Sequence, residues 1–369
     1  MQGKCLDFFL AANSPQGFIS RFDQLNNPKA LRRCYIIKGT SGNGKSTVLR
    51  KAAQALCELG ETVECIHCSS DPDSLDGILC ERLGVSVVDG TAPHVMEPQY
   101  PCAFETVVNL FDAVDIPKVA ARRDEVIALV DRNHQLQERV GRYLSAAGSL
   151  LQDNVRIGME CVDLPKVNKT ALRLARRLFG SGRRRDEGRE TVRFLSAVTN
   201  RGIVMFSDTA TQLCERLYLL EDDLGCASRA FLSSMRGLAL AAGQNVVACY
   251  CPMRPFEKIE HLLIPSAGIG FLTHNSFHRP EVPFTTRINC KRFMDTDRLK
   301  LQAHKLSFNR RATRELLAQA SKSAAEAKAT HDEIERIYGA ASDFTVVQAK
   351  ADALVAELRD AAAALPAAE

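Results

Sequence analysis

The sequence predicts an α/β protein built from two copies of a parallel-sheet domain, each followed by a helical hairpin. Three observations support this fold class. Apolar, strand-like runs alternate with helix-compatible runs, which is the pattern of a parallel sheet with helical crossovers. A glycine-rich loop joins an early strand to a helix, and much of the first half recurs in the second half.

The glycine-rich loop is Gly39-Thr40-Ser41-Gly42-Asn43-Gly44-Lys45-Ser46, which reads G-x-x-x-x-G-K-S, the phosphate-binding loop (P-loop, or Walker A) pattern. An apolar run, Cys34–Ile37, leads into it, and a helix-compatible run, Thr47–Leu59, leads out. The motif requires this strand–loop–helix context. The alternative is a glycine-rich turn that binds nothing, and the correct flanks disfavour it.

The residue types of this loop suit a triphosphate. Glycines let the backbone curl closely around phosphates, and successive N–H groups at a helix N-terminus attract anions. Lys45 can reach the β- and γ-phosphates, and the Ser46 hydroxyl can hold Mg²⁺. ATP with Mg²⁺ is the default ligand. The predicted nucleotide contacts are Gly39, Thr40, Ser41, Gly42, Asn43, Gly44, Lys45, Ser46 and Thr47.

The remaining elements of the first copy follow in order. We expect strands at Leu6–Ala12, Thr62–Ile66 and Val85–Val88, and a short helix from Ser74 to Leu83. Polar residues follow the strands, at the positions where ligands bind in parallel sheets. We therefore interpret these polar clusters as one site.

Asp89 ends an apolar strand, the usual place for a carboxylate that orients Mg²⁺ through water. It is predicted to be catalytic together with Lys45 and to serve the metal together with Ser46. The alternative is a turn residue, since Asp89-Gly90 is a common turn dipeptide. No glutamate follows Asp89, so no hydrolytic base can be assigned there. Asp71, Ser69 and Ser70 could position water or substrate, or could equally cap a loop.

Helices follow each copy. Residues 117–178 predict a helical hairpin, and a narrow apolar stripe from Leu317 to Tyr338 steps by three and four. Hairpin packing is favoured over a partner coiled coil, and His331 on the stripe is interpreted as structural. The predicted domains are 1–104, an active P-loop NTPase domain; 105–179, a helical hairpin; 180–190, a linker; 191–285, a degenerate P-loop-like domain; and 286–360, a second hairpin.

The recurrence indicates a duplicated domain, because its offset is nearly constant across four separate segments and its period is too long for a solenoid. Tyr35-Ile36-Ile37 recurs as Tyr218-Leu219-Leu220. The other matches are Gly42 with Gly225, Gly60 with Gly243, Val63 with Val246, Cys68 with Cys251, Pro72 with Pro255, Gly84 with Gly268, His94 with His278, Phe9-Leu10 with Phe194-Leu195, and Gly17 with Gly202.

The second copy lacks the phosphate ligands. The replacements are Gly39 by Asp222, Gly44 by Ala227, Lys45 by Ser228, Ser46 by Arg229 and Asp89 by Thr273. The Asp222-Asp223 pair would repel phosphate oxygens. We expect the second copy to keep the fold and to have lost this nucleotide site; the alternative is a different ligand.

Other groups invite a functional interpretation that the sequence does not favour. Because His94 recurs as His278 in the copy without a phosphate loop, it is interpreted as structural. Cys65-Ile66-His67-Cys68 resembles part of a zinc site, yet no second C-x-x-C exists, which favours reduced core thiols. A basic stretch could contact nucleic acid, but a solvated helix face is favoured because no aromatics are interleaved. This stretch comprises Lys166, Lys169, Arg173, Arg176, Arg177 and Arg183 to Arg185.

Bulk properties set further bounds. The 369 residues carry a net charge of +4, too small to indicate a nucleic-acid or membrane protein. The 13 cysteines are an odd number scattered through apolar segments, which favours a reducing cytoplasmic location. The N-terminus shows no signal-peptide pattern, and no apolar run is long enough to span a bilayer.

Taken together, these motifs resemble a family of bacterial tandem P-loop, ATPase-like, ATP-binding proteins. The resemblance rests on Gly39–Ser46, on residues 67–77 and on residues 89–94, and it covers nearly the whole chain. It implies nucleotide binding and hydrolysis. In that family the second copy often carries an intact phosphate loop, and this chain departs from that pattern, which puts any two-nucleotide mechanism in doubt.

The sequence thus predicts an ATPase or a nucleotide-dependent switch with one nucleotide site, in the first copy. The degenerate copy could supply a cation to the phosphates, with Arg229 and Arg254 as candidates, and the helical hairpins could signal to a protein partner. Two alternatives stay open. One is a small-molecule or nucleotide kinase that binds its acceptor through residues 71–76. The other is an interaction protein that binds nucleotide without hydrolysing it.

Overall fold

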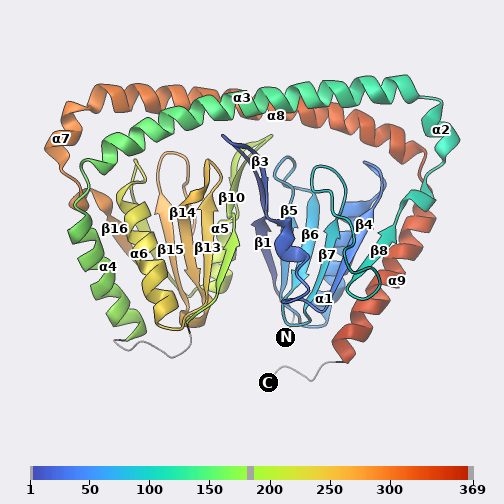
Figure 1. The fold of residues 1–369 in the computed structure, drawn as a ribbon, viewed down its shortest axis with the longest axis horizontal. Coiled ribbons are helices and arrows are strands. Elements are labelled where there is room, and N and C mark those ends of the chain that lie inside the picture. Colours follow the sequence, from blue (N-terminus) through green and yellow to red (C-terminus); the bar gives the residue numbers. More distant parts are fainter. Residues whose placement is uncertain (1–2, 181–186, 365–369) are drawn as a thin grey trace. The chain divides into compact units, whose positions relative to one another are not determined.

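The computed structural model describes residues 3–180 and 187–364 (Figure 1). The chain forms two compact units, and each unit combines segments that are far apart in the sequence. The first unit comprises Met1–Ala11, Ser20–Arg139 and Lys322–Glu369, and the second comprises Ala12–Ile19 and Val140–Ser321. The two units are described separately below.

The first unit contains a six-stranded sheet in the order β1-β5-β6-β7-β4-β8. All neighbours are parallel except β6, which runs antiparallel to both β5 and β7. Its strands are β1 (Cys5–Phe9), β4 (Arg33–Lys38), β5 (Val63–His67), β6 (Leu75–Cys80), β7 (Val85–Asp89) and β8 (Glu105–Asn109). A small separate hairpin pairs β2 (Ala11–Ser14) with β3 (Gly17–Ser20).

The predicted parallel sheet is thus mostly parallel with one antiparallel strand, and the helix predicted from Ser74 to Leu83 was wrong. Residues Leu75–Cys80 form β6 instead, and all six are buried. A strand that is buried on both faces shows no polar–apolar alternation, so a short apolar run of this kind cannot be distinguished from a buried helix by its pattern. Because β6 runs antiparallel, its first residues lie at the edge where β5 and β7 end.

The second unit repeats this architecture. Its sheet, read from β9, has the order β9-β13-β14-β15-β12-β16, again with one antiparallel strand, β14, inside an otherwise parallel sheet. The strands are β9 (Glu190–Arg193), β12 (Arg216–Glu221), β13 (Val246–Cys251), β14 (Arg254–Ile264), β15 (Ile269–His274) and β16 (Thr286–Asn289). The small hairpin also recurs, as β10 (Ser196–Thr199) and β11 (Gly202–Met205).

Backbone conformation agrees with the duplication. Four matched glycine pairs have positive φ in both copies: Gly17 and Gly202, Gly42 and Gly225, Gly60 and Gly243, Gly84 and Gly268. Only glycine adopts this region without strain, so these pairs mark turns that both copies need. The equal strand orders and the matched turns together show that the two sheets share one topology.

Nine α-helices lie within the described residues: α1 (Lys45–Glu58), α2 (Ile116–Ala120), α3 (Arg123–Met159), α4 (Leu164–Phe179), α5 (Ser207–Leu213), α6 (Ala227–Ala241), α7 (Thr296–Leu301), α8 (Ala303–Ala340) and α9 (Phe344–Ala363). The described residues also include four short 3-10 helices, η1 (Phe22–Leu25), η2 (Phe111–Ala113), η3 (Pro265–Ala267) and η4 (Cys290–Phe293). Most of the linker predicted at 180–190 and the residues beyond 364 lie outside the described part of the chain.

The core of each unit is completed by a helix that is distant in the sequence from most of its strands. Helix α9 packs on α1 in the first unit, and α4 packs on α6 in the second (Figure 1). On α9, Leu354 and Leu358 are buried in the first core, and on α4, Val167 and Ala171 are buried in the second. A fully buried leucine contributes about 1.5–3 kcal/mol. No helix in the described residues is long and apolar enough to cross a membrane.

Candidate functional site

The predicted phosphate loop, Gly39–Ser46 (the first loop below), connects β4 to α1 as expected. Gly42 and Gly44 have φ angles of +68° and +90°, and Gly44 caps the N-terminus of α1. Gly42 is constrained twice. A Cβ on it would lie 2.4 Å from the carbonyl oxygen of Glu335 on α8, so both the backbone angle and the close packing of α8 require glycine.

The first loop presents open hydrogen-bond donors. Within the described residues, the backbone N–H groups of Ser41 through Lys45 donate no hydrogen bond. Backbone N–H groups normally find partners, so a run of open donors at a helix N-terminus is a feature to explain. Such a run, together with the helix dipole, forms an anion-binding concavity.

Two side chains hold the loop in shape. Asn43 is fully buried, and with its amide oriented to suit its neighbours it accepts from the Thr40 N–H at 3.1 Å and donates to the Thr40 carbonyl at 2.8 Å. Gly39 leaves room for this side chain, because a Cβ there would lie 2.5 Å from the nearest atom of the Asn43 amide. These contacts stabilise the conformation of the loop.

Lys45 folds back over the loop. Its Nζ donates to the Thr40 carbonyl at 2.7 Å and lies 3.7 Å from Oδ2 of Asp89, the last residue of β7. Both side chains are largely buried. The predicted pair Lys45 and Asp89 is therefore brought together, beside the open N–H groups.

Asp89 makes the turn interaction that the sequence offered as the alternative to a magnesium role. Its Oδ1 accepts from the Thr91 N–H at 2.9 Å and from the Thr91 hydroxyl at 2.6 Å, a turn interaction, while its Oδ2 faces Lys45. Burial raises the pKa of Asp89, Lys45 and Thr91 oppose that rise, and the charge of Asp76 adds to it. A cation beside Asp89 would favour its ionised form.

Asp76 is a site residue that the sequence did not single out. It lies on β6, and the antiparallel register that pairs Gly77 with Val88 brings Asp76 opposite Asp89. Its Oδ2 lies 3.1 Å from Nε2 of His94. His94 is buried and stacks on Phe22 at a centroid distance of 4.0 Å, so it holds Asp76 in place rather than reaching into the loop.

The two remaining predicted contacts differ in exposure. The Ser46 hydroxyl accepts a hydrogen bond from the Leu75 N–H at 3.0 Å, which leaves its hydrogen and a lone pair for other partners. Thr47 is exposed. No group of three or more His, Cys, Asp or Glu side chains within the described residues could hold a metal ion on its own.

Helix α8 adds charged groups that sequence reasoning missed. Glu335 lies against the loop, and its pKa is lowered by a hydrogen bond from His331 and by attraction to Lys328 and Lys45, although burial opposes this. Lys328 Nζ lies 3.3 Å from Oδ2 of Asp71. These α8 residues follow the loop by almost 300 positions, and nothing in their local pattern distinguishes them from a solvated helix face.

The corresponding loop of the second unit, Asp222–Arg229 (the second loop below), is closed by its own side chain. Asp222, which replaces Gly39, accepts from the Leu224 N–H at 3.2 Å through Oδ1 and from the Ser228 N–H at 2.8 Å through Oδ2. A carboxylate of the protein therefore occupies the donors that would face a phosphate.

A lysine from another strand replaces the missing loop lysine. Lys258 on β14 lies beside Gly225, and its Nζ donates to Oε2 of Glu260 at 2.6 Å. Both side chains are buried. Burial alone would lower the pKa of Lys258 and raise that of Glu260. Their mutual attraction, together with the other charged groups around them, reverses both shifts, so the pKa of Lys258 is raised and that of Glu260 is lowered, which favours an ionised pair. Glu260 also accepts from the hydroxyl of Thr273, which stands where the first unit has Asp89.

The other groups considered from the sequence have structural partners. His67 lies 2.8 Å from Asp7 and 2.6 Å from the Pro72 carbonyl, which leaves no zinc site with Cys65 and Cys68. Arg254 and Arg229 both lie near Glu257, at 3.5 Å and 3.9 Å. The basic stretch lies on α4, where Lys169, Arg173, Arg176 and Arg177 are exposed, while Arg183 to Arg185 lie outside the described residues.

No family model, curated protein or solved structure matches this chain. The resemblance to tandem P-loop ATPase-like proteins therefore stays an expectation from the sequence.

Proposed function

We propose that the first unit binds a nucleoside triphosphate with Mg²⁺, ATP by default, at Gly39–Ser46. The observation that carries the proposal is the row of open N–H donors from Ser41 to Lys45. Five convergent donors at the start of a 14-residue helix favour a multiply charged anion. The same donors in the second loop are partly taken by Asp222, so the openness is not a general property of this turn.

The roles of the side chains follow from their positions. Lys45 would exchange its bond to the Thr40 carbonyl for the β- and γ-phosphates, and its charge would offset theirs. Ser46 would bind Mg²⁺ directly, and Asp89, with Asp76 beside it, would orient the water around the ion. Mg²⁺ supplies charge neutralisation across the phosphates when bound.

The proposed use of the bound nucleotide is hydrolysis or a nucleotide-dependent switch. The contact between Gly42 and Glu335 and the attraction between Lys45 and Glu335 support a switch that acts through α8. An incoming γ-phosphate would compete with Glu335 for Lys45, and α8 would respond. Hydrogen exchange in residues 328–339 should then change when Mg-ATP is added, and unchanged exchange there would contradict the switch.

The two alternatives, a kinase and a non-hydrolysing binding protein, can be distinguished from an ATPase by measuring what happens to the γ-phosphate of bound ATP. A kinase would transfer labelled phosphate to an acceptor, an ATPase would release it to water, and a non-hydrolysing binding protein would do neither. Asp71 and Asp76, which the kinase alternative assigns to the acceptor, are already engaged by Lys328 and His94. Their engagement favours release to water over transfer.

The test of the proposal is calorimetric binding of Mg-ATP and Mg-GTP to the parent and to Lys45→Ala. We expect the substitution to weaken binding by about 1.5–3 kcal/mol, since it removes charge-assisted contacts to phosphate. Lys51→Ala is the matched control, because Lys51 lies on the same helix and, among the residues that the structure describes, pairs only with Asp352 at the surface. A parent that takes up no Mg-nucleotide, or a Lys45→Ala variant that binds as tightly as the parent, would refute the proposal.

A further inference from the structure

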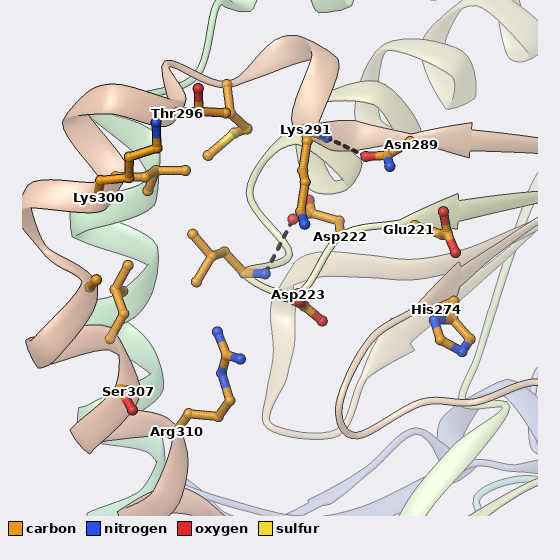
Figure 2. Close-up of a pocket in the computed structure, with 15 residues that line it drawn as sticks. Glu221, Asp222, Asp223, His274, Asn289, Lys291, Thr296, Lys300, Ser307 and Arg310 are labelled. Carbon is orange, nitrogen blue, oxygen red and sulfur yellow. Dashed lines mark hydrogen bonds between the residues drawn. The ribbon is translucent and has the colours of Figure 1, made fainter.

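The second unit contains a large cavity beside its closed loop. The cavity has a volume of about 910 Å³ and lies at the carboxyl ends of β12, β15 and β16 (Figure 2). Glu221, His274 and Asn289 mark those strand ends, and α7 and the first turns of α8 form the opposite wall. In open α/β sheets, ligands bind in the crevice outside the carboxyl ends of the strands, so the location suits a ligand site.

One end of this cavity is cationic. It adjoins a second cavity of about 340 Å³, and Arg310, Asp223 and His274 line both. Arg279 and Arg314 line the smaller cavity, and Lys291 lines the larger. Figure 2 shows the side chains of Arg310 and Lys291 extending toward the loop that carries Asp222 and Asp223.

The cations at this end form no ion pair among the described residues. Within residues 3–180 and 187–364, no ion pair involves Arg279, Lys291, Arg310 or Arg314, whereas the cavity residues Glu221 and Lys300 are paired with Arg287 at 3.1 Å and with Asp297 at 2.8 Å. Arg310 and Arg314 are four residues apart on one helix, a spacing at which like charges repel. Two loop carboxylates, Asp222 and Asp223, face these four cations, and Asp222 already accepts two loop N–H groups.

The loop itself does not provide the anion site. Asp222 already accepts the Leu224 and Ser228 N–H groups, so a ligand anion in this unit would be held by side chains and not by the backbone. Guanidinium groups are suited to this, because their planar donors bind phosphate oxygens in pairs.

The rest of the lining is partly apolar. Met294, which follows η4, Leu299 on α7 and Leu306 on α8 line the cavity beside the polar residues Thr296, Lys300 and Ser307. The volume falls within the range typical of small-molecule sites. The cavity therefore offers a cationic end and several apolar side chains, which together suit a ligand with one strongly anionic group on an apolar body.

We infer that the second unit binds a phosphate monoester of a small apolar organic group, with the phosphate held by Arg310 and the neighbouring cations. Two negative charges on one group match several cations better than a single carboxylate does. This site is distinct from the nucleotide site proposed for the first unit. A bound phosphate would account for the four cations beside a loop whose own N–H groups are already engaged by Asp222.

The test uses phenyl phosphate as the probe and measures binding by calorimetry to the full chain carrying Lys45→Ala, so that the first loop contributes little. We expect Arg310→Gln to weaken binding about tenfold or more. Arg311→Gln, an exposed neighbour on the same helix that lines neither cavity, should change binding less than twofold. Arg310→Lys should retain part of the affinity, and raised salt should weaken binding of the parent.

Three outcomes would overturn the inference. The first is no binding of phenyl phosphate to a folded chain, as judged by circular dichroism. The second is equal loss in the Arg310→Gln and Arg311→Gln variants, which would indicate general surface attraction. The third is equal binding of benzoate or phenol, because either would show that the site does not select phosphate.

Discussion

The first and second loops have the same backbone and opposite electrostatics. Gly42 and Gly225 both have φ near +68°, and both loops lead from a central strand into a helix. In the first loop the backbone N–H groups are open, and the nearby lysine, Lys45, belongs to the loop itself. In the second loop, Asp222 accepts hydrogen bonds from two of these N–H groups, and the nearby lysine, Lys258, comes from a neighbouring strand.

This difference shows that one loop conformation can be kept while the charges around it are changed. In the second unit, the protein's own side chains supply both an anion beside the loop N–H groups, Asp222, and a cation beside the glycine, Lys258. Lys258 is buried with its partner Glu260. The shared fold therefore does not indicate whether a unit binds a ligand at its loop, and that question depends on the side chains at each site.

The largest expected effect is a loss of stability when the buried lysine of the second unit, Lys258, is replaced. Lys258→Ala should lower the free energy of unfolding by about 3–5 kcal/mol, because it leaves the fully buried Glu260 without its cation. Lys45→Ala should cost much less stability, since Asp89 keeps its bonds to Thr91. Urea denaturation of both variants measures the contrast. Equal stability losses would show that the two lysines have the same kind of role.

The pH dependence of the unfolding free energy tests independently whether Lys258 and Glu260 form an ion pair. Burial would raise the folded-state pKa of Glu260, but Lys258, His278 and His261 together outweigh burial, so this pKa is lowered below its ordinary value of 4.5. Its stabilisation is therefore present above pH 4.5 and is lost as the pH falls through the folded-state pKa. The difference in unfolding free energy between the parent and a K258M/E260L variant should shrink from pH 5 to pH 3. A constant difference would mean that Glu260 is not ionised.

The next largest effect is a difference in stability cost between alanine substitutions at the two matched glycines, Gly42 and Gly225. Gly42→Ala should cost about 2–4 kcal/mol, because an alanine there combines left-handed strain with a clash against the Glu335 backbone. Gly225→Ala would meet the end of the Lys258 side chain and no backbone atom, so its cost should be smaller, about 1–2 kcal/mol, mainly from the backbone angle. Thermal and chemical denaturation measure both. A larger cost for Gly225→Ala would contradict the packing of α8 on the first loop.

Much of the first loop could be predicted from the sequence, because its contacts are local. The G-x-x-x-x-G-K-S pattern, its flanking strand and helix, and the carboxylate Asp89 all follow from residues within about 50 positions. The duplication could be detected because turn glycines such as Gly60 and Gly243 recur at a constant offset. The loss of phosphate ligands in the second copy follows from Asp222 and Ser228 standing in place of Gly39 and Lys45.

Other features depend on contacts that no local pattern encodes. The strand β6 was missed because burial on both faces removes the alternation by which strands are recognised. Asp76 became a site residue only because β6 is a strand. Glu335 lies against the first loop and Lys328 pairs with Asp71, and both come from α8, whose apolar stripe predicts packing but does not predict the contacts of its charged face. The sequence predicted that Asp222 would repel phosphate, but not that it would hold the loop closed.

The smallest expected effect tests whether α8 senses the nucleotide. Glu335 carries a negative charge that attracts Lys45, so it opposes the phosphates that Lys45 is proposed to bind. Glu335→Gln should tighten Mg-ATP binding by about 0.5–1 kcal/mol, a modest effect because the side chain is partly exposed. Glu333→Gln, an exposed neighbour, should leave the affinity unchanged. Calorimetry at low ionic strength measures the difference. Weaker binding of Glu335→Gln would mean that this carboxylate supports the metal rather than competing with the phosphate.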